Sequence, residues 1–271
     1  MIILVSNAAA LALYLAASGY LATTLFHKRS ADTNWLLCFT FTALLFHGIG
    51  IQGIIFGSDG YYLGFYKASS LIFWVINLIV LLSGLKKPLH NLFVFLFPMS
   101  TLAIICSMVS ESPVIPYSHL GPSIASHILF SFVAYSLLTI ATLQALLLAY
   151  QNYQLRHKHP TGIVRLLPPL QTMETLMFEL LWAGEVLLTL SIITGFLFIQ
   201  DLFAQHLIHK TVFSLISWLI YAVLLWGRHS RGWRGSVAIR WALGGFIALM
   251  LAYFGTKLVL EIILEIRTNS V

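Results

Sequence analysis

Long apolar runs separated by short polar connections fill the chain from end to end. A helix that crosses a membrane needs about 20 mostly apolar residues, because each residue adds about 1.5 Å and the hydrocarbon is about 30 Å thick. Such runs lie near residues 3–26, 35–57, 66–85, 89–109, 119–150, 176–199, 211–227 and 238–264. The pattern predicts an all-α integral membrane protein with about eight transmembrane helices.

The connections between these runs are short, with one exception. Residues 151–175 are basic at first and then contain Pro168 and Pro169, which predicts a loop or a surface helix. No stretch is long and polar enough for a soluble domain, and no short-period repeat is visible. We therefore expect a single multi-span membrane domain over residues 1–271.

Composition supports a membrane protein and removes other classes. Hydrophobic residues make up 59% of the chain and charged residues 9%, against about 25% charged residues in soluble domains. A soluble enzyme or a nucleic-acid-binding domain is thereby excluded. Nothing resembles a nucleophile triad, a P-loop or a dinucleotide fingerprint, so we expect no enzyme. The two cysteines, Cys38 and Cys106, form no metal-binding pair.

The basic residues predict how the helices are oriented. Connections on the cytoplasmic side of a membrane protein carry an excess of lysine and arginine. The first, third, fifth and seventh connections hold eleven of the fifteen basic residues, namely Lys28, Arg29, Lys86, Lys87, Arg156, Lys158, Arg165, Arg228, Arg231, Arg234 and Arg240. These connections are predicted to be cytoplasmic, which places both termini outside, in the periplasm of a bacterial inner (plasma) membrane protein.

Three histidines are candidates for binding a cofactor. His47 lies near the middle of the second span, with Gly48 and Gly50 leaving room for a flat ligand. His127 lies about two turns below the outer surface on the fifth span, and His209 lies just before the seventh. A buried histidine that bonds a neighbouring helix is the alternative interpretation for His47.

Histidine on separate spans suits haem better than a small ion. Neutral imidazole is a common ligand of haem iron and of zinc, but zinc requires a tight cluster of three or four ligands. We expect haem b and no other metal. Aromatic side chains would form the walls of the pocket, although such side chains are frequent throughout this chain. The candidates are Phe46, Phe130, Phe132, Tyr135, Phe213 and Trp218.

Acidic and basic residues inside the spans indicate a different function. Glu185 lies within the sixth span, and Lys257 and Glu261 lie four residues apart on the last. Ionisable groups at membrane depth are costly and often mark ion paths. A small transporter is therefore an alternative, beside a structural role for the Lys257–Glu261 pair.

Several segments of the second half resemble the cytochrome c assembly family of the CcsA/CcmC type. Residues 166–195 read LLPPLQTMETLMFELLWAGEVLLTLSIITG, like the segment before that family's haem-handling loop. Residues 209–246 contain a lysine, an SLISW core and a basic GWRG turn, and residues 126–138 read SHILFSFVAYSLL. The resemblance covers residues 119–260 and is closest to a short bacterial inner-membrane branch of the family.

The resemblance implies a membrane protein that binds haem and presents it on the outer face for attachment to apocytochrome c. By position, His127 corresponds to the family's outer histidine and His47 to a histidine buried in an early span. Other membrane proteins of cytochrome assembly are the partners that the family implies. An accessory subunit that stabilises another inner-membrane protein, for example an ion transporter, is the alternative, on the same scaffold without haem.

This sequence departs from the family pattern at three places. The tryptophan-rich WWD motif belongs near 197–209, where the chain reads LFIQDLFAQHLIH. A second outer histidine belongs near Leu264, and a histidine near the end of the seventh span is replaced by Trp226. We assign His209 as a substitute ligand, and this assignment is not the family's. Pairing of His127 with His47 or with His209 stays open, because His47 is predicted to lie deeper than His127.

Overall fold

A computed structural model describes residues 1–27, 31–56, 60–110, 114–116, 121–157, 167–198 and 208–255. Within these ranges, eight helices are long and apolar enough to cross a membrane. This confirms the predicted class, an all-α integral membrane protein. The orientation of the termini stays a prediction. Lys257, Glu261 and Leu264 lie outside the described residues.

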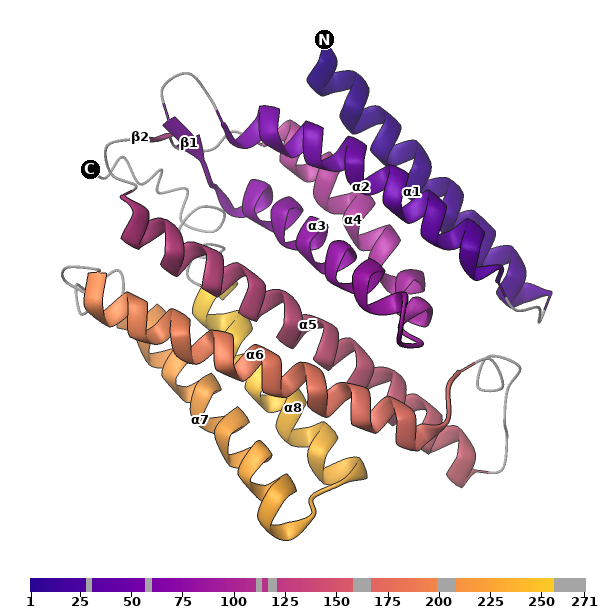
Figure 1. The fold of residues 1–271 in the computed structure, drawn as a ribbon, viewed down its shortest axis with the longest axis vertical. Coiled ribbons are helices and arrows are strands. Elements are labelled where there is room, and N and C mark those ends of the chain that lie inside the picture. Colours follow the sequence, from indigo (N-terminus) through magenta and orange to yellow (C-terminus); the bar gives the residue numbers. More distant parts are fainter. Residues whose placement is uncertain are drawn as a thin grey trace. The chain divides into compact units, whose positions relative to one another are not determined.

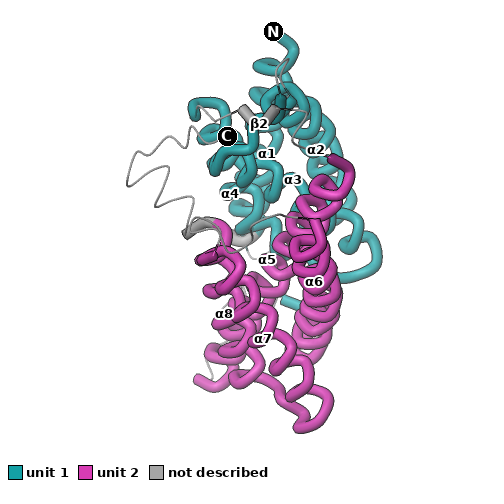
Figure 2. Tube along the Cα trace, turned by 90° about the vertical axis from the view of Figure 1, so that its left-hand side faces the viewer, with its two compact units in different colours: residues 1–117, 160–168 teal, residues 118–159, 169–271 magenta. Residues whose placement is uncertain are grey.

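The helices form two compact units (Figure 2). Unit 1 comprises residues 1–117 and 160–168, and unit 2 comprises residues 118–159 and 169–271. The prediction of one membrane domain over the whole chain stays a prediction. Each unit has its own buried core, so each is described by itself.

Unit 1 is a ring of four helices, α1 (Ile2–Phe26), α2 (Thr33–Ile55), α3 (Phe65–Gly84) and α4 (Phe93–Val109). Each helix packs against the next, and α4 packs back against α1 (Figure 1). Asp32 caps α2, since its carboxylate accepts the N–H groups of Asn34 and Trp35. A single 3₁₀ turn, η1 (His90–Leu92), leads into α4. The ring buries Tyr14, Ile76 and Phe97 at its centre.

Two short strands in unit 1 were not foreseen from the sequence. The strand β1 (Gly60–Tyr62) follows α2, and β2 (Val114–Pro116) follows α4. They pair antiparallel, with Tyr61 opposite Ile115. Three residues are too few to show the alternation of apolar and polar residues that identifies a strand. The pairing joins two connections at the same end of unit 1.

Unit 2 repeats the ring with four further helices, α5 (Pro122–Arg156), α6 (Leu170–Phe198), α7 (Ile208–Arg231) and α8 (Gly235–Met250). A π-helical turn, η4 (Leu251–Gly255), extends α8. As in unit 1, each helix packs against the next and the fourth packs against the first (Figure 1).

The helices next to the long connection are longer than predicted. The helix α5 continues to Arg156 rather than ending at 150, and α6 begins at Leu170 rather than at 176. Hydropathy marks only the part of a helix that lies in hydrocarbon, whereas polar residues continue it into the interface. Pro168 and Pro169 come directly before α6, which agrees with the preference of proline for helix starts.

Candidate functional site

His47 is fully buried in the core of unit 1 and both of its ring nitrogens have protein partners. The Tyr14 hydroxyl from α1 lies 3.3 Å from Nδ1, and the Ser70 hydroxyl from α3 lies 3.0 Å from Nε2. The Tyr14 ring meets the imidazole edge-on and packs against Phe97 on its other side. The imidazole therefore joins three helices of the ring through its two nitrogens.

The space at the neighbouring glycines is taken by protein side chains. A Cβ atom at Gly48 would lie 3.2 Å from Nε1 of Trp74, and one at Gly50 would lie 2.3 Å from Oδ1 of Asn7. Trp74 is held there because its Nε1–H donates to the carbonyl oxygen of Leu44, at 2.9 Å. The glycines let α1 and α3 approach α2, which is the usual use of small residues between membrane helices.

His127 lies one and a half turns into α5 and has one nitrogen bonded. Its Nδ1 lies 2.8 Å from the carbonyl oxygen of Ser191 on α6 and 3.4 Å from the Thr194 hydroxyl. A carbonyl oxygen only accepts hydrogen bonds, so Nδ1 carries the proton and Nε2 carries the lone pair. Among the described residues, Nε2 has no hydrogen-bond partner.

Small residues on α6 make this contact possible. A Cβ atom at Gly195 would lie 3.1 Å from Cε1 of His127, so only a glycine leaves the ring its present place. One turn deeper, the hydroxyls of Ser131 and Ser191 lie 2.7 Å apart. Gly184, Ser191 and Gly195 share one face of α6, and such spacing of small residues is a sequence signal for a tight helix interface. This spacing is visible in the sequence, but it does not by itself indicate a contact with His127.

His209 lies at the same end of unit 2 as His127. It is exposed on the first turn of α7, directly after the connection from the end of α6. His127 is near the start of α5, which runs antiparallel to α6, as its contact with Ser191 shows. The structure thus brings these two candidates to one end of one unit, whereas His47 belongs to unit 1.

Two of the predicted pocket residues already have polar partners inside unit 2. The Tyr135 hydroxyl donates to Sδ of Met250, and its ring lies beside Phe246 and Tyr253. Trp218 donates its Nε1–H to the Thr189 hydroxyl, at 2.9 Å. These aromatic side chains hold α5 to α8 and α7 to α6. Phe130 and Phe213 are half-buried, as are Phe132, on α5, and Phe46, on α2.

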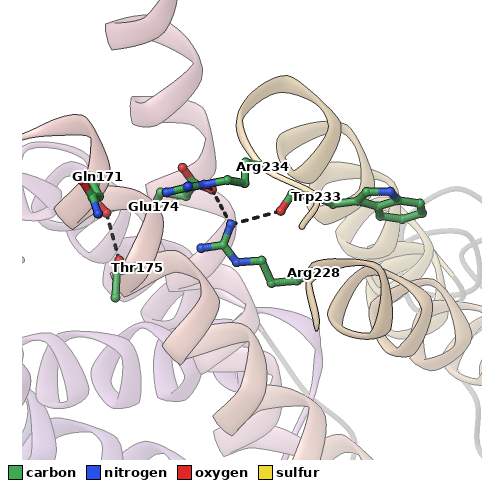
Figure 3. A network of polar contacts seen from close by, with 6 residues as sticks. All are labelled: Gln171, Glu174, Thr175, Arg228, Trp233 and Arg234. Atoms are coloured by element: carbon green, nitrogen blue, oxygen red, sulfur yellow. Dashed lines mark hydrogen bonds and ion pairs between the residues drawn. The ribbon is translucent and has the colours of Figure 1, made fainter. Parts of the chain in front are cut away.

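The opposite end of unit 2 is held by an ion-pair network that sequence reasoning missed (Figure 3). Glu174 on α6 is 4% exposed, and its Oε1 lies 3.1 Å from the Arg228 guanidinium and 3.4 Å from that of Arg234. Arg228 also donates to the carbonyl oxygen of Trp233 and lies over the ring of Phe178. From the sequence, the basic residues of the last connection indicate only the orientation of the helices. A lone acidic residue at the start of α6 was the available signal.

No group of three or more histidine, cysteine or acidic side chains that could hold a metal ion is found in the described part of the chain.

Comparison with known proteins identifies similar chains. The family model described as "Cytochrome C assembly protein" matches residues 35–264. The inner membrane protein YpjD of Escherichia coli K12 is 34% identical over 225 residues, which is 82% of this chain and 84% of that protein. The cytochrome c biogenesis protein CcsA of Prochlorococcus marinus MIT 9515 is 34% identical over 89 residues, 32% of this chain and 28% of that protein. No solved structure matches.

Proposed function

This chain belongs to the cytochrome c assembly protein family and is a multi-pass protein of the bacterial inner membrane, and on that premise we propose that it binds and handles haem b, which His127 would hold through its iron. It acts without turnover of its own, and presents haem toward the periplasm to partner proteins of cytochrome assembly.

The hydrogen bond between Nδ1 of His127 and the Ser191 carbonyl supports this proposal most directly. Histidines that bind metals usually donate the other ring N–H to a carbonyl or carboxylate, which sets the tautomer and the ring orientation. In His127, the Nδ1–H already donates to the Ser191 carbonyl in this way. Its Nε2 lone pair can bind iron without breaking a protein contact.

His209 would be the second histidine to hold the haem iron. It lies at the same end of unit 2, and its exposure leaves the imidazole free to turn toward a haem beside His127. His47 has less support as a ligand, because binding iron would remove a hydrogen bond with Tyr14 or Ser70 in a fully buried site. Bound haem would supply a redox-active iron. The chain's own part is to orient Nε2 and, through Phe130 and Phe213, to keep water from the haem face.

The accessory-subunit alternative draws on one observation. Residues 197–209 contain no tryptophan where the family carries its tryptophan-rich motif. Without that surface, the scaffold would stabilise another inner-membrane protein and contain no haem.

Absorption spectra with pyridine haemochrome analysis on detergent-purified protein test the proposal. The wild type is compared with His127→Gly, His209→Ala and His47→Ala, and with His229→Ala as a control for an exposed histidine on α7. We expect a haem b spectrum that is lost in His127→Gly and regained when imidazole is added, since imidazole can replace the missing ring. A colourless wild type after haem supplementation would contradict haem binding and favour the accessory subunit.

A further inference from the structure

Glu185 is a buried carboxyl group near the middle of α6 that the proposed haem site does not use. It is 6% exposed, and neither of its side-chain oxygens has a hydrogen-bond partner among the described residues. The Tyr221 hydroxyl on α7 is fully buried and also has no hydrogen-bond partner within the described part of the chain. Buried polar groups are nearly always hydrogen-bonded, so two such groups at one depth require an explanation.

The helix register places these two groups together. Thr189 on α6 bonds Trp218 on α7, and nearer the other end Glu174 bonds Arg228, so the two helices are antiparallel. Glu185 is one turn before Thr189, and Tyr221 is about one turn after Trp218. Starting from the Thr189–Trp218 hydrogen bond, one turn toward the Glu174–Arg228 contact leads to Glu185 on α6 and to Tyr221 on α7. Glu185 is also an electrostatic neighbour of Tyr221.

The other two helices of unit 2 complete the surroundings. Thr142 on α5 lies next to the Tyr221 hydroxyl and donates its own hydrogen to the Leu138 carbonyl, which leaves its oxygen able to accept. On the far side the Tyr221 ring lies against Gly245 of α8, where a Cβ atom would approach to 2.8 Å. Packing against Gly245 thus holds the Tyr221 ring in place.

Among the described residues, the helix turns around Glu185 carry no positive charge. Within the described part of unit 2, no lysine, arginine or histidine lies within one turn of Glu185 or Tyr221 along their helices, and Arg228 and Arg234 bond Glu174 instead. Tyr221 on α7 is the titratable neighbour of Glu185 among the described residues, and Tyr135 on α5 is a neighbour of Tyr221. An isolated carboxylate without a cation is very costly to bury, and such a group takes up a proton instead.

We propose that Glu185, with the Tyr221 and Thr142 hydroxyls, forms a membrane-embedded proton-binding site in unit 2, separate from the haem site. The carboxylate takes up one proton to become a carboxylic acid and releases it again. The acid can donate to one hydroxyl and accept from another, which satisfies all three groups. A leucine or glutamine would fill the same space, so an exchangeable proton is the property that glutamate adds.

Labelling with dicyclohexylcarbodiimide tests the site, because this apolar reagent reacts with protonated carboxyl groups inside membranes. The purified wild-type protein is labelled over a series of pH values, in choline, sodium or potassium chloride, and the modified residue is found by mass spectrometry. We expect an adduct on Glu185 that decreases as pH rises and that does not depend on the salt. Glu179→Gln, an exposed site on the same helix, should keep the adduct on Glu185, and Glu185→Gln should lose it.

Other outcomes overturn the proposal in separate ways. No adduct on Glu185 at any pH, or an adduct of constant yield, excludes an exchanging proton. Protection by sodium or potassium identifies a metal cation site instead. Because labelling is read on the wild type, it does not depend on the folding of a variant. Labelling of His127→Gly should be unchanged, so this test and the haem test fail independently.

Discussion

Two histidines inside membrane helices differ in what their nitrogens bond. His47 in unit 1 meets hydroxyl groups at both nitrogens, from Tyr14 and Ser70. His127 in unit 2 meets the Ser191 carbonyl at Nδ1, and Nε2 has no partner among the described residues. The first holds helices together, whereas the second is held in position by its helix neighbour and offers a lone pair. Judged by burial alone, His47 would be the better candidate for a haem ligand. The hydrogen bonds favour His127 instead.

The substitution His127→Ala tests the difference between the two histidines most strongly. We expect haem content per protein to fall at least about tenfold, because loss of a ligand should cost no less than loss of a supporting hydrogen bond, which lowers metal affinity about 10- to 100-fold. The measurement is the ratio of haem absorbance to protein. Retention of haem by this variant, with loss in His47→Ala, would exchange the roles of the two histidines.

His47→Phe should affect stability and leave haem content unchanged. The change removes two buried hydrogen bonds between helices and leaves two hydroxyl groups without partners, at a cost of about 1–3 kcal/mol in the free energy of unfolding. Thermal unfolding in detergent measures the loss. His229→Ala is the control, because its side chain is exposed. An unchanged unfolding temperature would show that the Tyr14 and Ser70 contacts do not hold unit 1 together.

Gly195→Ala tests whether the position of the His127 ring matters. The new methyl group would lie 3.1 Å from Cε1, so the ring must shift and its bond to the Ser191 carbonyl must weaken. We expect haem affinity to fall about tenfold, the lower end of the range for groups that support a ligand. Haem titration of the apoprotein gives this number. Gly244→Ala on α8 is a matched control, since nothing lies within 4 Å of its new methyl group; equal effects in both variants would argue against positioning.

Tyr14→Phe should have the smallest effect. It removes the longer of the two His47 contacts and keeps the ring, so about 0.6 kcal/mol of stability is lost, the average for hydrogen bonds between membrane helices. The same unfolding measurement applies. A loss as large as that of His47→Phe would mean that Tyr14 alone carries the contribution assigned to both hydroxyl groups.

The number and order of the helices could be predicted from the sequence because each apolar run must be long enough to cross the hydrocarbon. The ends of α5 and α6 could not, because their polar turns lie beyond the apolar runs. The two short strands were missed for a related reason, since three residues carry no periodic pattern.

The candidate site was predictable in part. His127 could be identified as a candidate from the resemblance to the cytochrome c assembly family and from the position of this histidine within the fifth span. Its contact with Ser191 uses a backbone carbonyl, and every residue has one, so no residue type in the sequence marks it. At His47 the neighbouring glycines predicted open space, but Trp74 and Asn7 fill it from other helices. The surroundings of both histidines therefore depend on contacts between segments that are distant in the sequence.

The closed rings of helices have a consequence for how the protein is made. In each unit the last helix packs against the first, α4 against α1 and α8 against α5. Chains are synthesised from the N-terminus, and early segments wait for later ones. After insertion, α1 therefore keeps one flank toward lipid until α4 arrives, and α5 does so until α8 arrives. A ribosome that stalls after α7 would leave unit 1 complete and unit 2 open, with the α5 flank that α8 covers exposed to membrane quality control.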